Sequence, residues 1–187
     1  MSPLRWAFSI IGYPLGSLAA IQVASTTSGP WLAALAGLIA GTVLGTAQWL
    51  ALRPAVSWRW IPASAAGLAL GTSLGAAVTG GADDLGSLVL YGAIAGAAMG
   101  IAQGLILGAR RIVPWAATVS GSWAIAWIIT KAVIIDEQKG FVTFGLSGAA
   151  IATLATGIVL RLYLGKRDRT LAASAAAAEP STEAVSA

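Results

Sequence analysis

Long apolar runs separated by short polar segments dominate the pattern along this chain. Six runs reach the length that a helix needs to cross a bilayer core, about 20 mostly apolar residues. None of the six contains an Asp or a Glu. The runs cover about Trp6–Ala24, Trp31–Leu52, Trp60–Val78, Leu85–Leu107, Trp115–Ile135 and Phe141–Leu164. The pattern therefore predicts an all-α polytopic membrane protein with six transmembrane helices.

Composition agrees with this assignment and narrows the chemistry. Of the 187 residues, 57% are hydrophobic and 10% are charged, whereas an average soluble domain is about 25% charged. The chain has no His and no Cys, which excludes the usual transition-metal and haem ligands, thiol nucleophiles and imidazole bases. Zincin and P-loop motifs are also missing. We expect a protein that is not an enzyme, with no cofactor, no metal and no nucleic-acid partner.

The loop charges predict the orientation in the membrane. Nine of the eleven basic residues fall on one side of the predicted spans, and the acidic loops fall on the other. The positive-inside rule makes the basic side cytoplasmic, so both termini are expected inside. Its basic residues are Arg5, Arg53, Arg59, Arg110, Arg111, Arg161, Lys166, Arg167 and Arg169.

The two ends of the chain need separate interpretation. The first run could be a cleaved signal peptide, but Tyr13 and Pro14 in its middle and its match to a later run favour a retained span. Beyond the last run the composition changes to basic residues and then to Ala, Ser, Glu and Pro. We expect residues 1–165 to form the transmembrane domain and residues 166–187 to be a disordered cytoplasmic tail, because the tail has little apolar surface to bury.

The sequence repeats after about 55 residues. Gly37–Leu52 aligns with Gly92–Leu107, and nine of sixteen positions are identical, including Gln48 over Gln103. The last run, with a two-residue deletion, aligns as well and places Thr156 where the other two have Gln. Other pairs at the same offset are Trp60 and Trp115, Gly12 and Gly67, and Gly16 and Gly71. The chain thus predicts three parallel-repeat hairpins, related by an axis along the membrane normal, in a pseudo-three-fold bundle.

Glycines recur at intervals of four residues in three of the runs. Positions i and i+4 share one helix face, so each run has a flat groove, or glycine zipper, into which another backbone can press. We interpret these grooves as helix-packing surfaces, with a subunit interface or a pore lining as the alternative. The residues are Gly37, Gly41, Gly45, Gly67, Gly71, Gly75, Gly92, Gly96 and Gly100.

Three polar residues are candidates for the interior of the bundle: Gln48, Gln103 and Lys131. Each Gln follows a glycine by three residues and so shares its glycine face. An interhelical hydrogen bond is the favoured role, and a ligand contact is the alternative. Lys131 is the one charged residue inside the first five predicted spans. It is expected to snorkel to the outer interface, with an ion or substrate site as the alternative.

Tryptophans stand at the ends of several runs. Trp6, Trp60 and Trp115 begin spans on the predicted cytoplasmic side, and Trp31 begins one on the outer side. Because an indole is stable where one edge meets water and the other meets lipid, we interpret all four as interfacial anchors.

The segment Gly41–Arg53 reads G-x-x-x-G-x-x-Q-W-L-x-L-R and precedes a short Trp-rich loop. It resembles uncharacterised bacterial polytopic membrane proteins that repeat this unit. The echo from Gly92 is looser, since Gly104 and Gly108 stand where the first copy has Trp49 and Arg53. The resemblance implies an architecture only, and no activity. Together with the orientation above, we expect the protein in the bacterial cytoplasmic membrane.

Two functional hypotheses follow. The first is a non-catalytic structural or accessory membrane protein, which packs with itself or with another membrane protein in the lipid bilayer. The second is a small-solute or ion channel, or the substrate-binding subunit of a transporter. A sealed bundle centre would favour the first, and a polar cavity would favour the second.

Overall fold

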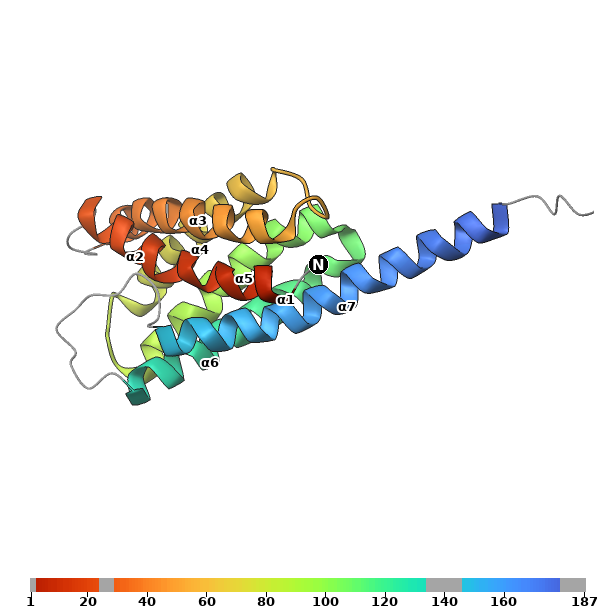
Figure 1. Ribbon diagram of the computed structural model, residues 1–187. Helices are drawn as coiled ribbons and strands as arrows, with labels where there is room; N and C mark the ends of the chain where they lie inside the picture. The colour runs from red at the N-terminus through yellow and green to blue at the C-terminus, as the bar shows by residue number, and fades with distance from the viewer. Residues whose placement is uncertain (1–2, 24–28, 134–145, 179–187) are drawn as a thin grey trace, which may run out of the picture.

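The computed structural model describes residues 3–23, 29–133 and 146–178, and within them every regular element is a helix. Figure 1 shows the helices packed side by side as a bundle, from which the last helix projects. In chain order they are α1 (Pro3–Phe8), the 3-10 turn η1 (Ser9–Ile11), α2 (Gly12–Val23), α3 (Pro30–Leu52), α4 (Trp60–Thr79), α5 (Leu85–Leu107), the 3-10 turn η2 (Ala109–Arg111), α6 (Ile112–Val133) and α7 (Leu146–Ala178).

Five helical stretches in the described residues are long and apolar enough to cross a membrane. They are Leu4–Gln22, Pro30–Leu52, Trp60–Thr79, Leu85–Leu107 and Ala109–Ala132, and they correspond to the first five predicted spans. The sixth is described in part, as the apolar segment Ser147–Tyr163 of α7. The protein is therefore a helical, multi-pass, membrane-embedded chain.

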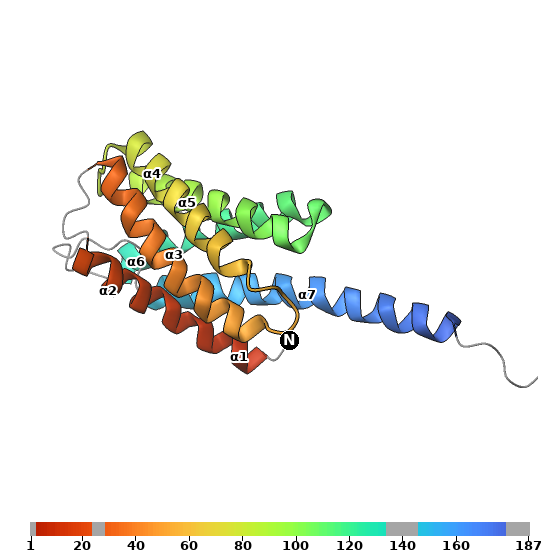
Figure 2. The ribbon, with the colours of Figure 1, turned by 90° about the horizontal axis from the view of Figure 1, so that it is seen from above.

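The helices form a ring in which neighbours in sequence are neighbours in space. Each helix from α2 to α6 packs against the one that follows it, and α7 closes the ring against α1, η1 and α2. Figure 2 shows the same order from above, with α7 beside α6 and the N-terminal helices. Short connections explain the order, because they join consecutive helices as antiparallel pairs.

The first span is interrupted near its start by the η1 turn. Pro14 lies in the first turn of α2 and has no backbone N–H to donate to the carbonyl of Ile10, four residues earlier. The chain therefore tightens to a 3-10 turn over Ser9–Ile11, and the Ser9 hydroxyl donates to the Trp6 carbonyl oxygen at 2.6 Å. This break explains why span one consists of two short helices.

The connection between α4 and α5 has conventional helix caps. Gly80 follows α4 in the left-handed conformation, with φ at 64°. Glycine adopts this conformation readily because it has no Cβ to clash with the backbone. Asp84 caps α5, where its carboxylate accepts from the Ser87 backbone N–H at 3.1 Å and from the Ser87 hydroxyl at 2.5 Å. These hydrogen bonds from Ser87 hold the pKa of Asp84 below its usual range. The position of Asp84 is thus explained by the helix cap.

The C-terminal segment differs from the predicted tail. α7 continues as a helix to Ala178 and extends past the other helices, whereas the sequence predicted no regular structure from residue 166 onward. Ala has the highest helix propensity, and a helix that is already nucleated elongates without the cost of starting a new one. Residues 179–187 lie outside the described residues, so that part of the predicted tail is not described.

Candidate functional site

The glycine faces bring the helices into backbone contact. A Cβ added at any of the nine predicted packing glycines would approach an atom of a neighbouring helix more closely than 3.0 Å. A Cβ on Gly41, for example, would lie 2.7 Å from the Ser64 carbonyl oxygen of α4. By contrast, a Cβ on Gly121 in α6 would meet nothing within 4 Å. The predicted glycines therefore lie at the helix contacts in this structure.

These contacts recur with the spacing of the sequence repeat. A Cβ on Gly96, 55 residues after Gly41, would lie 2.8 Å from the carbonyl oxygen of Val119, which is 55 residues after Ser64. The contact therefore has a counterpart of nearly the same length between α5 and α6.

The packing of α2 on α3 is likewise repeated by α4 on α5. A Cβ on Gly16 or on Gly71 would lie 2.9 Å from the carbonyl oxygen of its partner, Ala40 or Ala95 respectively. The two glycines are again 55 residues apart, and so are the two alanines. Glycine positions thus set the same register at these two helix contacts.

Each Gln lies inside its hairpin and accepts a hydrogen bond from a tryptophan twelve residues later. Trp60 Nε1 donates to Gln48 Oε1 at 3.1 Å, and Trp115 Nε1 donates to Gln103 Oε1 at 3.1 Å. Gln48 and Trp60 lie near the linked ends of α3 and α4, and Gln103 and Trp115 near the linked ends of α5 and α6. The two hairpins therefore carry the same buried bond.

A direct hydrogen bond joins the two glutamines across the ring. Gln103 Nε2 donates to Gln48 Oε1 at 3.0 Å and to the Ser64 hydroxyl oxygen at 2.9 Å. The Ser64 hydroxyl in turn donates to the Trp60 carbonyl oxygen at 2.8 Å. We name Gln48, Ser64, Trp60, Gln103 and Trp115 the glutamine cluster. It ties α3, α4, α5 and α6 together.

The tryptophans fix which way the two amides point. An indole N–H is a donor only. Gln48 must therefore turn its amide oxygen toward Trp60, and Gln103 must turn its amide oxygen toward Trp115. The Gln103 nitrogen is then directed at Gln48 and Ser64, both of which offer oxygen acceptors. One consistent set of donors and acceptors follows, which stabilises a single arrangement of four helices.

These side chains and several aromatic rings lie at the centre of the ring. Gln48 is 4% exposed and Gln103 is 1% exposed, while Ser64, Trp60 and Trp115 are also buried. The Trp60 and Trp115 rings lie 6.3 Å apart between centroids. In a second layer, Tyr13 of α2 packs on Trp123 of α6, with ring centroids 6.1 Å apart. Side chains of non-adjacent helices therefore meet across the centre at two levels.

The last helix joins the ring in a different way. Thr156 stands at the predicted Gln position, and its hydroxyl donates to the Ala152 carbonyl oxygen of its own helix at 2.5 Å. Trp6 consequently has no amide partner on α7, and its Nε1 donates to the Thr153 carbonyl oxygen at 2.7 Å. The indole also covers Gly157, where a Cβ would overlap the ring. The third contact therefore includes a buried tryptophan but lacks the glutamine.

Lys131 does not join the glutamines. It lies 16 residues after Trp115 on α6, or about 24 Å along the helix axis. Its ammonium group donates to the Asp83 carbonyl oxygen in the α4–α5 connection at 3.5 Å. Asp136 and Glu137, the carboxylates nearest to Lys131 in sequence, lie outside the described residues. Of the three candidates for a polar interior, the structure brings only Gln48 and Gln103 together.

The prediction that Trp6, Trp60 and Trp115 are interfacial anchors is wrong. Each is at most 4% exposed and donates inside the bundle, whereas Trp31 is 88% exposed, as an interfacial residue would be. The sequence carried a usable signal, since a Trp follows each Gln by twelve residues in both copies of the repeat. Ser64 had no such signal, because its Gln103 contact joins residues of different hairpins.

The described residues contain no group of three or more His, Cys, Asp or Glu that could hold a metal ion. No protein-family model, no curated protein and no solved structure matches the chain.

Proposed function

We propose that the chain is a non-catalytic integral membrane protein with a structural or accessory role. The observation that carries the proposal is the glutamine cluster, whose buried side chains are hydrogen-bonded to one another across the ring. A conduit needs polar groups that face water or a solute. Polar groups that are satisfied inside a membrane bundle instead hold helices together. The partner would be a second copy or another membrane protein.

The proposal includes the finer architecture, three parallel-repeat hairpins with a pseudo-three-fold axis. The paired contacts 55 residues apart, Gly41 with Gly96 and Gln48 with Gln103, support it for two of the hairpins. The closure of the ring by α7 on α1 and the Trp6 contact with Gly157 support it for the third. On this proposal, the likeness of the Gly41–Arg53 segment to repeated bacterial units reflects a shared bundle.

We further propose a bacterial cytoplasmic membrane with both termini on the cytoplasmic side. Basic side chains lie at one end of the bundle, near α1, the last residues of α3 and α5, and the first residues of α6. Arg5 donates to the Leu50 carbonyl oxygen at 2.6 Å, and the Arg111 guanidinium lies 5.6 Å from the Tyr163 ring centroid. A basic end of this kind supports a cytoplasmic placement by the positive-inside rule.

Single cysteines test this topology cleanly, because the natural chain has none. We expect Asp83→Cys to react with an impermeant thiol reagent added outside intact cells, and Ala109→Cys to react only after the cytoplasmic side is opened. Both positions are exposed, and Asp83 leaves the Asp84 helix cap intact. Reaction of both cysteines from the same side would contradict the topology.

Reconstitution into liposomes tests the role. We expect the purified protein to give no flux of potassium ions or of a small neutral solute such as glycerol above that of protein-free liposomes, because the glutamine cluster blocks the centre. Co-purification in mild detergent would then reveal the partner or a homo-oligomer.

The same assay tests the competing hypothesis, a channel or a transporter subunit. The buried amides at the centre favour that hypothesis, because polar residues inside a membrane often mark functional sites. A measurable flux that changes in folded Gln48→Leu or Gln103→Leu variants would contradict the structural role and support a conduit.

A further inference from the structure

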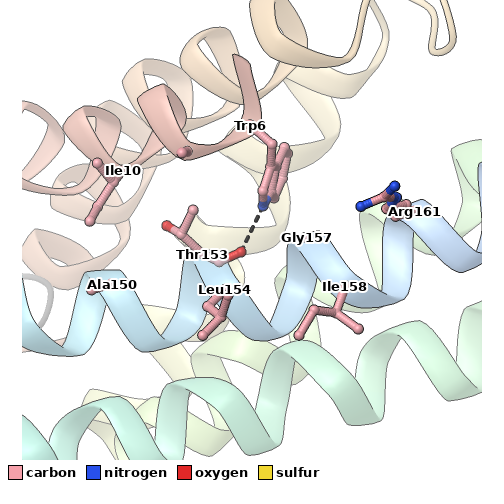
Figure 3. Close-up of a pocket in the computed structure, with 9 residues that line it drawn as sticks. Trp6, Ile10, Ala150, Thr153, Leu154, Gly157, Ile158 and Arg161 are labelled. Atoms are coloured by element: carbon pink, nitrogen blue, oxygen red, sulfur yellow. Dashed lines mark hydrogen bonds between the residues drawn. The ribbon is translucent and has the colours of Figure 1, made fainter. Parts of the chain in front are cut away.

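A lateral cleft of about 490 Å³ lies between the N-terminal helices and α7. This is within the ordinary range of small-molecule sites, about 300–1,000 Å³. Figure 3 shows Trp6 and Ile10 on one wall and Leu154 and Ile158 on α7. The cleft is separate from the glutamine cluster, since none of its lining residues belongs to that cluster. Its walls are almost entirely apolar, apart from Thr153 and Arg161.

Thr153 is the unusual residue in the cleft. Its hydroxyl is buried and has no hydrogen-bond partner in the described part of the chain, and the residue is 6% exposed. The hydroxyls of Thr118 and Thr156 donate to the carbonyl four residues earlier on their own helices. The Thr153 hydroxyl instead lies on the side of α7 that faces Ile10 across the cleft (Figure 3). An unpaired hydroxyl here is a donor for a bound acceptor.

Arg161 lies at the basic end of the same cleft. It is eight residues after Thr153, or about 12 Å along the helix axis. The reach of the two side chains and a hydrogen bond of about 3 Å at each leave a gap of several ångström between the acceptors. A phosphate and the neighbouring acyl-ester carbonyl of a phosphoglyceride span such a gap, with the phosphate nearest the charged end. The apolar wall beyond Thr153 would then face the acyl chains.

We propose that this cleft binds one anionic phosphoglyceride from the leaflet at the basic end of the bundle. Arg161 holds the phosphate, the Thr153 hydroxyl donates to an ester carbonyl, and the acyl chains lie along Ile10 and Leu154. The lipid is the surrounding solvent of a membrane-embedded chain, and the basic residues near this end favour a negative headgroup. The inference depends on the membrane placement above but not on the structural role.

The experiment is native mass spectrometry of the purified full-length protein, titrated in detergent with palmitoyl-oleoyl phosphatidylglycerol. We expect one tightly bound lipid per chain. Arg161→Gln should weaken binding about tenfold and Thr153→Val about threefold, since each removes one hydrogen bond, the first of them charged. Arg59→Gln and Thr118→Val are matched controls. Both residues lie outside the cleft, so their lipid affinity should stay at the wild-type value.

An ether-linked phosphatidylglycerol sharpens the assignment, because it keeps the phosphate and lacks the ester carbonyls. It should bind wild type about threefold more weakly, and Thr153→Val should add no further loss. Lipid binding that is unchanged in both Arg161→Gln and Thr153→Val would overturn the proposal. So would the absence of bound lipid together with an Ala150→Cys disulfide between two copies, which would place a second chain in the cleft. Neither result would alter the flux expected of the bundle centre.

Discussion

Gly41→Leu should destabilise the folded bundle strongly, and Gly96→Leu should do so to a similar extent. At both positions the first carbon of the new side chain already lies within 2.8 Å of a backbone oxygen of the facing helix. Backbone cannot rotate away as a side chain can, so α3 must separate from α4, or α5 from α6. Overpacking costs about 1–3 kcal/mol or more, and we expect the upper end. The measurement is the free energy of unfolding in mixed micelles.

Gly121→Leu is the matched control for both variants. It makes the same substitution within a helix, but at an exposed position where an added Cβ meets nothing within 4 Å. Replacing Gly by Leu raises intrinsic helix propensity by about 0.8 kcal/mol in all three variants, so the difference from the control isolates packing. Equal stability of Gly41→Leu, Gly96→Leu and Gly121→Leu would show that the glycine grooves do not hold the helices together.

Gln103→Leu should have the next largest effect. The substitution removes the acceptor of Trp115 Nε1 and the donor to Gln48 and Ser64. Hydrogen bonds between membrane helices contribute about 0.6–2 kcal/mol, and a buried indole N–H without a partner adds to the loss. We expect the free energy of unfolding to fall by roughly 2 kcal/mol. Gln48→Leu should cost somewhat less, about 1 kcal/mol.

The double variant tests whether the two glutamines act as a pair. Each single variant already breaks the Gln48–Gln103 bond, so the double variant should lose less stability than the two single losses added together. The shortfall should be about 0.6 kcal/mol, the average for such a bond. Gln22→Leu is the control, since Gln22 is exposed on α2. Strict additivity would mean that the amides do not interact.

Much of the helical architecture could be predicted from the sequence. The run Leu85–Leu107 matches α5 at both ends, because apolar length and a flanking Asp84 cap are local properties. The glycine positions predicted the helix contacts, because spacing of four residues on a helix defines a face whatever lies opposite. Lys131, which the sequence analysis grouped with the glutamines as a candidate for the interior, lies near the far end of its helix, against the α4–α5 connection.

The composition of the candidate site was only half predictable. Gln48 and Gln103 share a glycine face by spacing alone, but Trp60 and Trp115 were interpreted as lipid-interface residues. A tryptophan at the end of a span is equally compatible with lipid and with the interior, and the two cases differ by a rotation of the helix about its axis. The Thr153 hydroxyl was likewise invisible in the sequence, since a threonine on a helix ordinarily bonds to its own backbone.

The sequence by itself determined the first five spans, their antiparallel order and the glycine faces along which they pack, because hydropathy, loop length and i, i+4 spacing act within one or two helices. Only the tertiary structure decided which side chains meet across the ring. Gln48 bonds to Gln103, and Tyr13 packs on Trp123, although their helices are not neighbours. Such contacts depend on the rotation and tilt of all the helices at once, which no local pattern specifies.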